Sequence, residues 1–227
     1  MHVTILGTRG NIPASAPKHA RHAGVLIDGK LLLDVGERAY LRSKPRYIFL
    51  THLHPDHAAI TEADLRGDAV VFAPERTRDL PGAKIISRTV TVDSYRVTPV
   101  PTIHSTKVRS TGYVVRTRGH SLFYSSDLVA IAPRFRRRLR NLDLVITEGS
   151  FMRKGGMVRR NPATGQRFGH AGIPDLVELF RPFTERIVFT HFGSWFYKDI
   201  RAAIRKIEAL GNGISVKAGH DGMKLKI

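Results

Sequence analysis

Four side chains that commonly bind metal ions lie within six residues, in the segment IFLTHLHPDHAAI. They are His52, His54, Asp56 and His57. In an extended backbone, side chains two positions apart project to the same side, so His52 and His54 can bind one ion together. Pro55 then turns the chain, and Asp56 and His57 can face a second ion beside the first. Because paired ions catalyse hydrolysis by activating water, this spacing predicts a dinuclear hydrolase site.

The segment is framed by patterns that would hold it in place. An apolar strand at 46–51 precedes it, and residues 59–65 have the pattern of a short helix. The positive N-terminal end of that helix would favour the carboxylate of Asp56. Scattered surface histidines are the alternative interpretation. The agreement between motif, preceding strand and following helix favours a built site.

The remainder of the chain alternates strands with a few helices. Asp28-Gly29 between two apolar runs predicts a hairpin, and 112–118 with 121–126 predicts another. Helical spacing is found at 173–180 and 198–210, and a final strand is expected within 214–218 or 222–227. This order predicts an α/β protein with two mixed β-sheets packed face to face and helices on the outer faces, an αββα sandwich. No linker is evident, so we expect one domain over 1–227.

Composition narrows the chemistry. The chain has no cysteine, which excludes disulfides, thiol nucleophiles and cysteine-based zinc sites. Its formal net charge of +18 would attract polyanions, of which nucleic acid is the commonest, although a generally basic proteome would give the same composition. No apolar run approaches the roughly 20 residues that span a bilayer, and the N-terminus lacks signal-peptide features. We therefore expect a cytoplasmic protein without a membrane partner.

The pattern His-x-His-x-Asp-His after a strand resembles the signature of the metallo-β-lactamase superfamily, and the resemblance covers nearly the whole chain. The segment LLLDVGE resembles the first motif of that family, which implies that Asp34 lies behind the ligands and accepts a hydrogen bond. VPTIHST, LFYSSD and IVFTHFG resemble later motifs and imply three more ligands: His104, Asp127 and His191. The resemblance implies one ion on His52, His54 and His104, a second on Asp56, His57 and His191, and Asp127 on both. Zn²⁺ is favoured, with Mn²⁺ or iron as alternatives.

Within that superfamily, the chain resembles the phosphodiesterase branch that includes ribonuclease Z-like enzymes. LVITEGSF and FGHAGIPDLVELF match stretches in which a glutamate and a histidine pair near the leaving oxygen, which implies these roles for Glu148 and His170. Ala171-Gly172 departs from the Ser-Thr expected there, and His170 capping the next helix is the competing interpretation. Metal-activated hydroxide would attack phosphorus, Asp56 would accept its proton, and His170 would protonate the leaving oxygen.

Two basic segments could contact a nucleic-acid backbone, with RNA favoured as the partner. They contribute Arg136, Arg137 and Arg138, and then Arg159 and Arg160 within a short basic flap at 153–169. Solvated basic loops are the alternative for both. Two rival functions stay open at this point: a thioesterase or lactonase on the same scaffold, and a nucleic-acid-binding protein without catalysis. A homodimer is compatible with the sequence.

Overall fold

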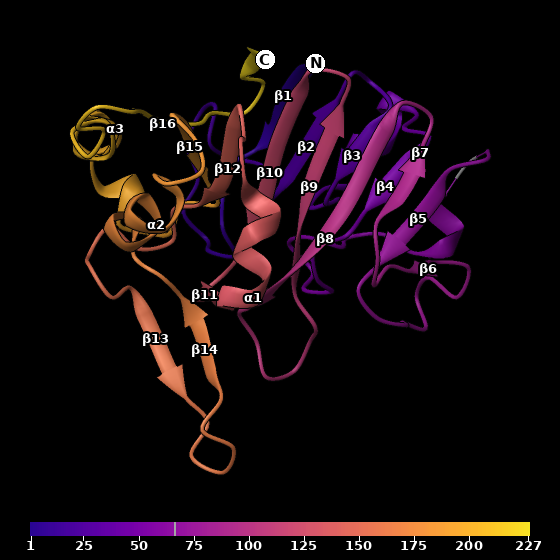
Figure 1. Cartoon of the computed structure of the whole chain (residues 1–227), viewed down its shortest axis with the longest axis horizontal. Coiled ribbons are helices and arrows are strands. Elements are labelled where there is room, and N and C mark those ends of the chain that lie inside the picture. Colours follow the sequence, from indigo (N-terminus) through magenta and orange to yellow (C-terminus); the bar gives the residue numbers. More distant parts are fainter. Residues whose placement is uncertain (66) are drawn as a thin grey trace.

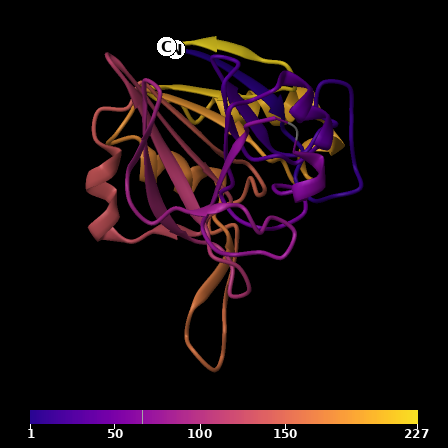
Figure 2. The ribbon, with the colours of Figure 1, turned by 90° about the vertical axis from the view of Figure 1, so that its right-hand side faces the viewer.

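Two β-sheets pack face to face in the computed structural model, which describes residues 1–65 and 67–227 (Figures 1 and 2). The first sheet has the strand order β17-β1-β2-β3-β4-β5-β6, and its strands are β1 His2–Gly7, β2 Gly24–Ile27, β3 Leu31–Leu33, β4 Tyr47–Phe49, β5 Val70–Ala73, β6 Lys84–Ile85 and β17 Lys224–Lys226. The second has the order β11-β8-β9-β10-β12-β15-β16 with β7 beside β8, and its strands are β7 Val90–Val92, β8 Tyr95–Ile103, β9 Thr111–Thr117, β10 His120–Ser126, β11 Ala130–Ile131, β12 Leu144–Glu148, β15 Arg186–Thr190 and β16 Ser215–Ala218. Both sheets mix parallel and antiparallel pairs, as the sequence predicted.

Both predicted hairpins are confirmed. Strands β2 and β3 are joined by residues 28–30, in which Asp28 and Gly29 have φ angles of 49° and 69° that suit a tight hairpin turn. Strands β9 and β10 pair antiparallel, with Thr117 opposite His120. Tight hairpins at these points leave the opposite strand ends free to carry longer loops, and those loops build the candidate site.

Apolar residues form three layers, which gives the αββα arrangement. The layer between the sheets includes Ile5, Phe49, Tyr124 and Ile146, each at most 1% exposed. Full burial of such a side chain contributes about 1.5–3 kcal/mol. A second layer lies on the outer face of the second sheet, and a third on the outer face of the first sheet. The molecule therefore has the predicted fold class.

The helices are distributed unevenly over the two outer faces. Apolar residues of α2, Ile173–Phe180, and α3, Ile200–Glu208, pack into the layer on the second sheet, and α1, Pro133–Arg136, follows β11. The first sheet is covered instead by 3₁₀ turns, at Arg38–Ser43 and Glu62–Asp64, and by loops. None of the helices in the described residues is long and apolar enough to cross a bilayer.

Two local predictions need correction. The helix expected at 59–65 is wrong, since only Glu62–Asp64 form a 3₁₀ turn. The chain stays extended before it because Ala59 donates its N–H to the carbonyl of Val35, 2.8 Å away, beside a parallel bridge between Val35 and Ala58. At the C-terminus the two expected alternatives both occur, as β16 and β17.

A two-stranded hairpin projects away from the two sheets (Figures 1 and 2). It consists of β13, Met157–Arg160, and β14, Arg167–His170, with Met157 opposite His170 and Arg160 opposite Arg167. We call residues 157–170 the arm. It occupies the segment expected to be a basic flap, and its base ends at His170 on the rim of the candidate site.

Candidate metal centre

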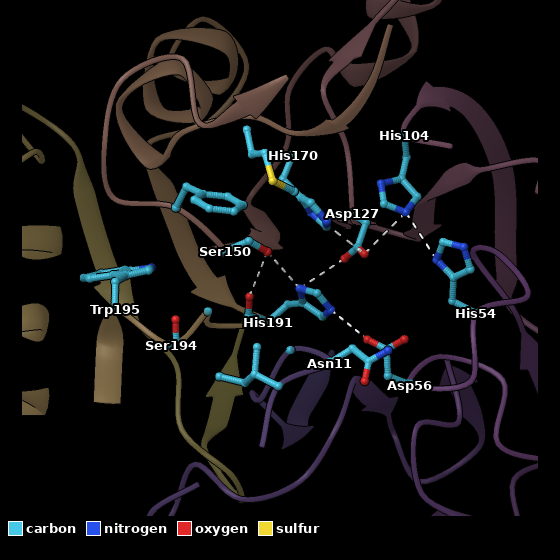
Figure 3. Close-up of a pocket in the computed structure, with 15 residues that line it drawn as sticks. Asn11, His54, Asp56, His104, Asp127, Ser150, His170, His191, Ser194 and Trp195 are labelled. Carbon is cyan, nitrogen blue, oxygen red and sulfur yellow. Dashed lines mark hydrogen bonds and ion pairs between the residues drawn. The ribbon is translucent and has the colours of Figure 1, made fainter. Parts of the chain in front are cut away.

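Loops at the carboxyl ends of strands bring the predicted ligand residues together. His52 and His54 follow β4, His104 follows β8, and Asp127 follows β10. One ligand atom from each of these four residues lies within 4.8 Å of every other. A second group meets the same distance criterion. It combines Asp56 and His57, which lie in the loop after β4 of the first sheet, with His191, which follows β15 of the second sheet. Figure 3 shows most of these side chains pointing into a shared space.

Asp127 lies between the two groups and faces each with a different oxygen. Its Oδ2 is 3.8 Å from Nε2 of His52 and 3.6 Å from Nε2 of His104. Its Oδ1 is 3.5 Å from Nε2 of His57. The same oxygen is 3.2 Å from Nδ1 of His191, a contact that is drawn in Figure 3. The carboxylate is 3% exposed, so it has little access to water. A carboxylate in this position can bridge two cations.

Two buried nitrogens show that this donor set suits cations. The Nε2 atoms of His52 and His57 are buried and have no hydrogen-bond partner among the described residues. The Nδ1 of His57 is 2.9 Å from Oδ2 of Asp34 and donates to it, so Nε2 is the nitrogen that faces the cluster. Burial lowers the pKa of His57, but Asp127, Asp56 and Asp34 outweigh it and raise that pKa well above its usual value, so a cation would bind Nε2 by displacing a proton. A buried polar atom without a partner costs about 1–3 kcal/mol. Imidazole nitrogens and carboxylates are the ligands that zinc and similar divalent ions prefer, so the residues present fit such ions.

Asp34 fixes the metal-binding loop from behind. Its carboxylate is fully buried and accepts hydrogen bonds from the backbone N–H of Thr51 at 2.7 Å and from the Thr51 hydroxyl at 2.8 Å. The hydroxyl of Tyr124, on the facing sheet, donates to the same carboxylate at 2.9 Å. Together with the contact to His57, these bonds set the ring orientation of a predicted ligand. This is the position expected of Asp34 from its motif.

Other hydrogen bonds orient the remaining rings. The Nδ1 of His104 lies 3.0 Å from the carbonyl oxygen of Gly169, at the base of the arm. The hydroxyl of Ser150 lies 3.1 Å from Nδ1 of His191, whose Nε2 is 3.0 Å from Oδ2 of Asp56. Because a carbonyl only accepts, Nδ1 of His104 carries the proton and its Nε2 presents a lone pair to the cluster.

Burial and mutual contact shift the pKa values in opposite directions. Burial, with the neighbouring His57, lowers the pKa of His52 well below its usual value, so this ring is neutral and can donate a lone pair. Burial alone would raise the pKa of Asp56, but the positive charge of the adjacent His57 and the hydrogen bond from His191 outweigh it and hold that pKa far below its usual range. Neutral imidazole and ionised carboxylate are the forms that bind metal.

The environment of Asp56 differs from the prediction. No helix begins near this residue: it lies in a turn closed by hydrogen bonds from the N–H groups of His57 and Ala58 to the carbonyl of His54, at 3.0 and 2.9 Å. Contacts with His57 and His191, rather than a helix end, keep its carboxylate ionised.

Left-handed backbone conformations occur at three site positions that are not glycine. They are Asp34 at φ 60°, Ser126 at φ 48° and His191 at φ 51°. Such conformations cost of order 1–3 kcal/mol each and persist where the surroundings enforce them. The sequence offered no signal for them, because none of these residues is a type that marks such a turn by itself. Six other non-glycine residues of the described chain have this conformation away from the site, so it does not by itself mark the site.

Glu148 and His170 form a pair at the edge of the cluster, with Nδ1 of His170 4.0 Å from Oδ2 of Asp127. Glu148 is fully buried at the end of β12 and accepts a hydrogen bond from the backbone N–H of Leu128 at 2.7 Å. Its Oε2 lies 2.8 Å from Nδ1 of His170, whose side chain is 18% exposed. Burial lowers the pKa of His170, but the charge of Glu148 and their hydrogen bond outweigh it and raise that pKa to about 9. His170 therefore does not cap α2 with its side chain, since the structure assigns it to Glu148.

A cavity of about 360 Å³ opens onto the cluster. Besides the predicted site residues, its walls include several that sequence reasoning did not assign to the site: Asn11, Ile12, Ser150, Phe151, Met157, Ser194 and Trp195. Gly10 approaches His191 so closely that an added Cβ would lie 3.2 Å from its ring. Neither this close approach nor the hydroxyl of Ser150 had a signal in the sequence.

The predicted basic residues differ in what they contact. Arg136 and Arg138 are partly buried, and each donates to a backbone carbonyl, of Ile131 and Pro99 respectively. Arg137 is exposed, as are Arg159 and Arg160 on the arm. The structure thus gives two of the five a packing role and leaves three with their side chains in solvent.

Comparison with known families agrees with this arrangement. A model described as a beta-lactamase superfamily domain matches residues 36–192 of the 227. The chain belongs to this superfamily. The match includes every predicted ligand, from His52 to His191, and together with the fold it makes the chain a metallo-β-lactamase-fold hydrolase with a cluster of residues suited to divalent metal ions. A search of curated proteins gave no match.

Solved structures of the same fold cover almost the entire chain. The short form of human tRNase Z is 17% identical, with a TM-score of 0.70 over 100% of this chain and 99% of that one. A diphosphatase from the PhnP family is 20% identical, with a TM-score of 0.71 over 99% and 97%. The metallo-beta-lactamase fold protein YhfI from Bacillus subtilis is 18% identical, with a TM-score of 0.70 over 99% and 98%. These likenesses establish the fold.

Proposed function

We propose that this metallo-β-lactamase-fold protein is a metal-dependent phosphodiesterase that cleaves nucleic acid, with RNA as the favoured substrate. The observation that carries the proposal is the pair of Glu148 and His170. Its hydrogen bond of 2.8 Å engages Nδ1 of His170, so Nε2 is the ring nitrogen left for a substrate in the cavity. Attack of hydroxide on a carbonyl needs no such histidine, whereas phosphodiester cleavage must protonate a poor leaving group.

The seven residues of the metal cluster are assigned as in the sequence prediction. His52, His54 and His104 would hold one divalent ion and Asp56, His57 and His191 the other, with Asp127 on both. Zn²⁺ is the favoured metal, because nitrogen donors predominate. When bound, such ions supply a positive field that makes water nucleophilic near neutral pH and offsets charge on phosphate oxygens. The buried, partnerless Nε2 atoms of His52 and His57 support this assignment.

The side chains around the cavity would orient the attacking water and protonate the leaving group. Asp56 is ionised and accepts a hydrogen bond from His191, so its carboxylate can hold the attacking water in place. Its lowered pKa makes it a weak base, so the acidity that releases the proton of the water would come from the metal ions. On the opposite side, His170 would donate a proton from Nε2 to the leaving oxygen as its bond to phosphorus breaks. Glu148 would hold the ring in place and stabilise its positive charge.

Uncompensated positive charge supports a polyanionic substrate. Among the described residues, ion pairs between carboxylates and Lys or Arg side chains are formed by Arg38, Arg46 and Lys154. The chain has 37 Lys and Arg residues, so ion pairs of this kind neutralise only a small part of the positive charge. The exposed arginines of the arm lie next to the cavity, because the arm begins at Met157 and ends at His170, which both line it. The relationship in fold to a tRNase Z is consistent with this proposal.

Hydrolysis of bis(p-nitrophenyl) phosphate with added Zn²⁺ or Mn²⁺, beside a thioester and a lactone, tests the reaction class. We expect turnover of the phosphodiester and little of the other two. The decisive comparison is His170→Ala with an RNA oligonucleotide as substrate, whose poor leaving group needs protonation: cleavage should slow while both ions stay bound. Preferential thioester or lactone hydrolysis by the wild type, or an RNA cleavage rate that His170→Ala leaves unchanged, would contradict this function. RNA binding without any hydrolysis would instead support a binding protein.

A further inference from the structure

A second cleft lies on the other side of the loop that carries His104. Its volume is about 470 Å³, and its walls come from the ends of β5, β6 and β8, the loop 105–110 and Gln166 of the arm. His104 faces the metal cluster, whereas the next residue, Ser105, lines this cleft. The two cavities are therefore separated by the thickness of one loop, and an extended polymer can occupy both.

The loop 105–110 is held in shape before any ligand binds. The Ser105 hydroxyl accepts the backbone N–H of Lys107 at 3.1 Å, and Oε1 of Glu75 accepts that of Arg109 at 2.9 Å. Gln166 donates its side-chain N–H to the carbonyl of Ser105 at 3.2 Å, which ties the loop to the arm. These bonds fix where the side chains of Lys107 and Arg109 begin, which lowers the ordering cost of binding.

The charges of the cleft suit a phosphate. Lys107 and Arg109 are exposed at its wall, and neither forms an ion pair with the described carboxylates. The carboxylate of Glu75 lines the same cleft, and the backbone N–H of Arg109 donates to it. Two cations against one carboxylate leave a net charge of +1 in the cleft.

Two hydroxyls in the wall lack partners. Oγ1 of Thr102 and Oγ of Ser110 are buried and make no hydrogen bond within the described part of the chain. A buried hydroxyl without a partner destabilises a protein, so a ligand that pairs with it gains free energy. Both oxygens are shielded from solvent, and a ligand reaches them only if the wall of the cleft adjusts. A ribose hydroxyl can both donate to and accept from such groups.

We propose that this cleft binds a ribonucleotide of the substrate strand beyond the one at the metal centre. Lys107 and Arg109 contact its phosphate, and the hydroxyls of Thr102 and Ser110 pair with its ribose. The inference rests on the proposed function in that the same strand crosses the loop 105–110 to reach His170. It adds the part of the substrate that is recognised, and a physical reason for RNA to bind better than DNA.

Binding of short single-stranded RNA to the metal-free protein tests the cleft without catalysis. Fluorescence anisotropy in EDTA, over a range of salt, would compare the wild type with K107Q/R109Q and with R205Q/K206Q, which removes the same charge from exposed positions of α3. We expect K107Q/R109Q to weaken binding about tenfold. The slope of log affinity against log salt concentration should become shallower by up to about 1.4, because each lost phosphate contact removes about 0.7 from it. Equal losses in the two variants would overturn the proposal, because only the overall field would then matter.

A second variant, T102V/S110A, tests the ribose contacts. It should lower affinity for RNA, leave affinity for DNA of the same sequence unchanged, and keep or raise the melting temperature, since it removes two partnerless hydroxyls. An unchanged ratio of RNA to DNA affinity would overturn the ribose contact. Hydrolysis of bis(p-nitrophenyl) phosphate, which is too small to span both cavities, should be unaffected in K107Q/R109Q. If the wild type hydrolyses no phosphodiester, the proposed function fails, while the EDTA binding data still decide the cleft.

Discussion

The two sides of the main cavity present histidines in opposite states. On the side of the first sheet, His52 and His57 are fully buried and their Nε2 atoms lack hydrogen-bond partners in the described residues. On the other side, His170 is partly exposed and its Nδ1 is already paired with Glu148. The buried nitrogens without partners destabilise the first side, and a bound cation would remove that cost. On the other side the hydrogen bond between Glu148 and His170 forms without a cation, and Nε2 of His170 is left for a substrate.

This difference teaches that histidines within one small space can serve two separate purposes. In both, a carboxylate holds Nδ1: Asp34 on His57 and Glu148 on His170. The difference lies at the outer nitrogen, because Nε2 of His57 is buried without a partner among the described residues, whereas the side chain of His170 is 18% exposed. If this division is right, changes on the first side should remove metal, and changes on the second should slow the reaction with metal still bound. The predictions below test that separation, beginning with the largest effect.

His54→Ala should abolish turnover and lower metal content. His54 is within 4.8 Å of the other donors of its group, and its loss leaves that ion with one nitrogen fewer. Elemental analysis of purified protein and hydrolysis of bis(p-nitrophenyl) phosphate would measure both effects. His2→Ala, an exposed histidine of β1, is the matched control. Full metal content in His54→Ala would show that this side of the cavity does not hold the ion.

His170→Ala should reduce phosphodiester turnover by about 10²–10⁴-fold, the usual contribution of general acid–base catalysis, with both ions retained. Glu148→Gln should act in the same direction, because it weakens the bond that orients the ring and stabilises its charge. A substrate with a good leaving group needs less protonation, so p-nitrophenyl esters should lose less rate than RNA. His120→Ala is the control, because His120 begins β10, at the end of that strand away from Asp127. Loss of metal in His170→Ala would erase the distinction between the two sides.

Asp34→Asn should weaken metal affinity by about 10–100-fold, as is typical for a residue that orients a ligand. The amide can keep only part of the four hydrogen bonds that the carboxylate accepts, and it loses the charge opposite His57. Competition with a chromogenic chelator would measure the affinity. Tyr124→Phe removes one donor to the same carboxylate without touching His57, and it should change metal affinity less. Equal effects of the two changes would indicate general loosening of the core instead.

Much of the fold and of the candidate site could be predicted because it depends on local signals. The turn at Asp28-Gly29 sets one hairpin, and apolar strands ending in histidine or aspartate mark the cluster. What the sequence could not give depends on long-range pairing. The bridge between Val35 and Ala58 overrides the helical pattern after His57, and the backbone carbonyl of Gly169 orients His104 from 65 residues away.

The smallest effect concerns the arm, whose exposed arginines lie beside the side of the cavity that carries His170. Replacing Arg159, Arg160 and Arg167 by Gln should weaken RNA binding and leave the metal content unchanged. The slope of log affinity against log salt concentration should become shallower by up to about 2, because each lost phosphate contact removes about 0.7 from it. Turnover of bis(p-nitrophenyl) phosphate should stay the same, because a small ester does not extend onto the arm. A triple change of Arg201, Arg205 and Lys206 on α3 is the control. An equal loss of affinity in that control would show that the arm makes no specific contact with RNA and that binding depends only on the overall positive charge.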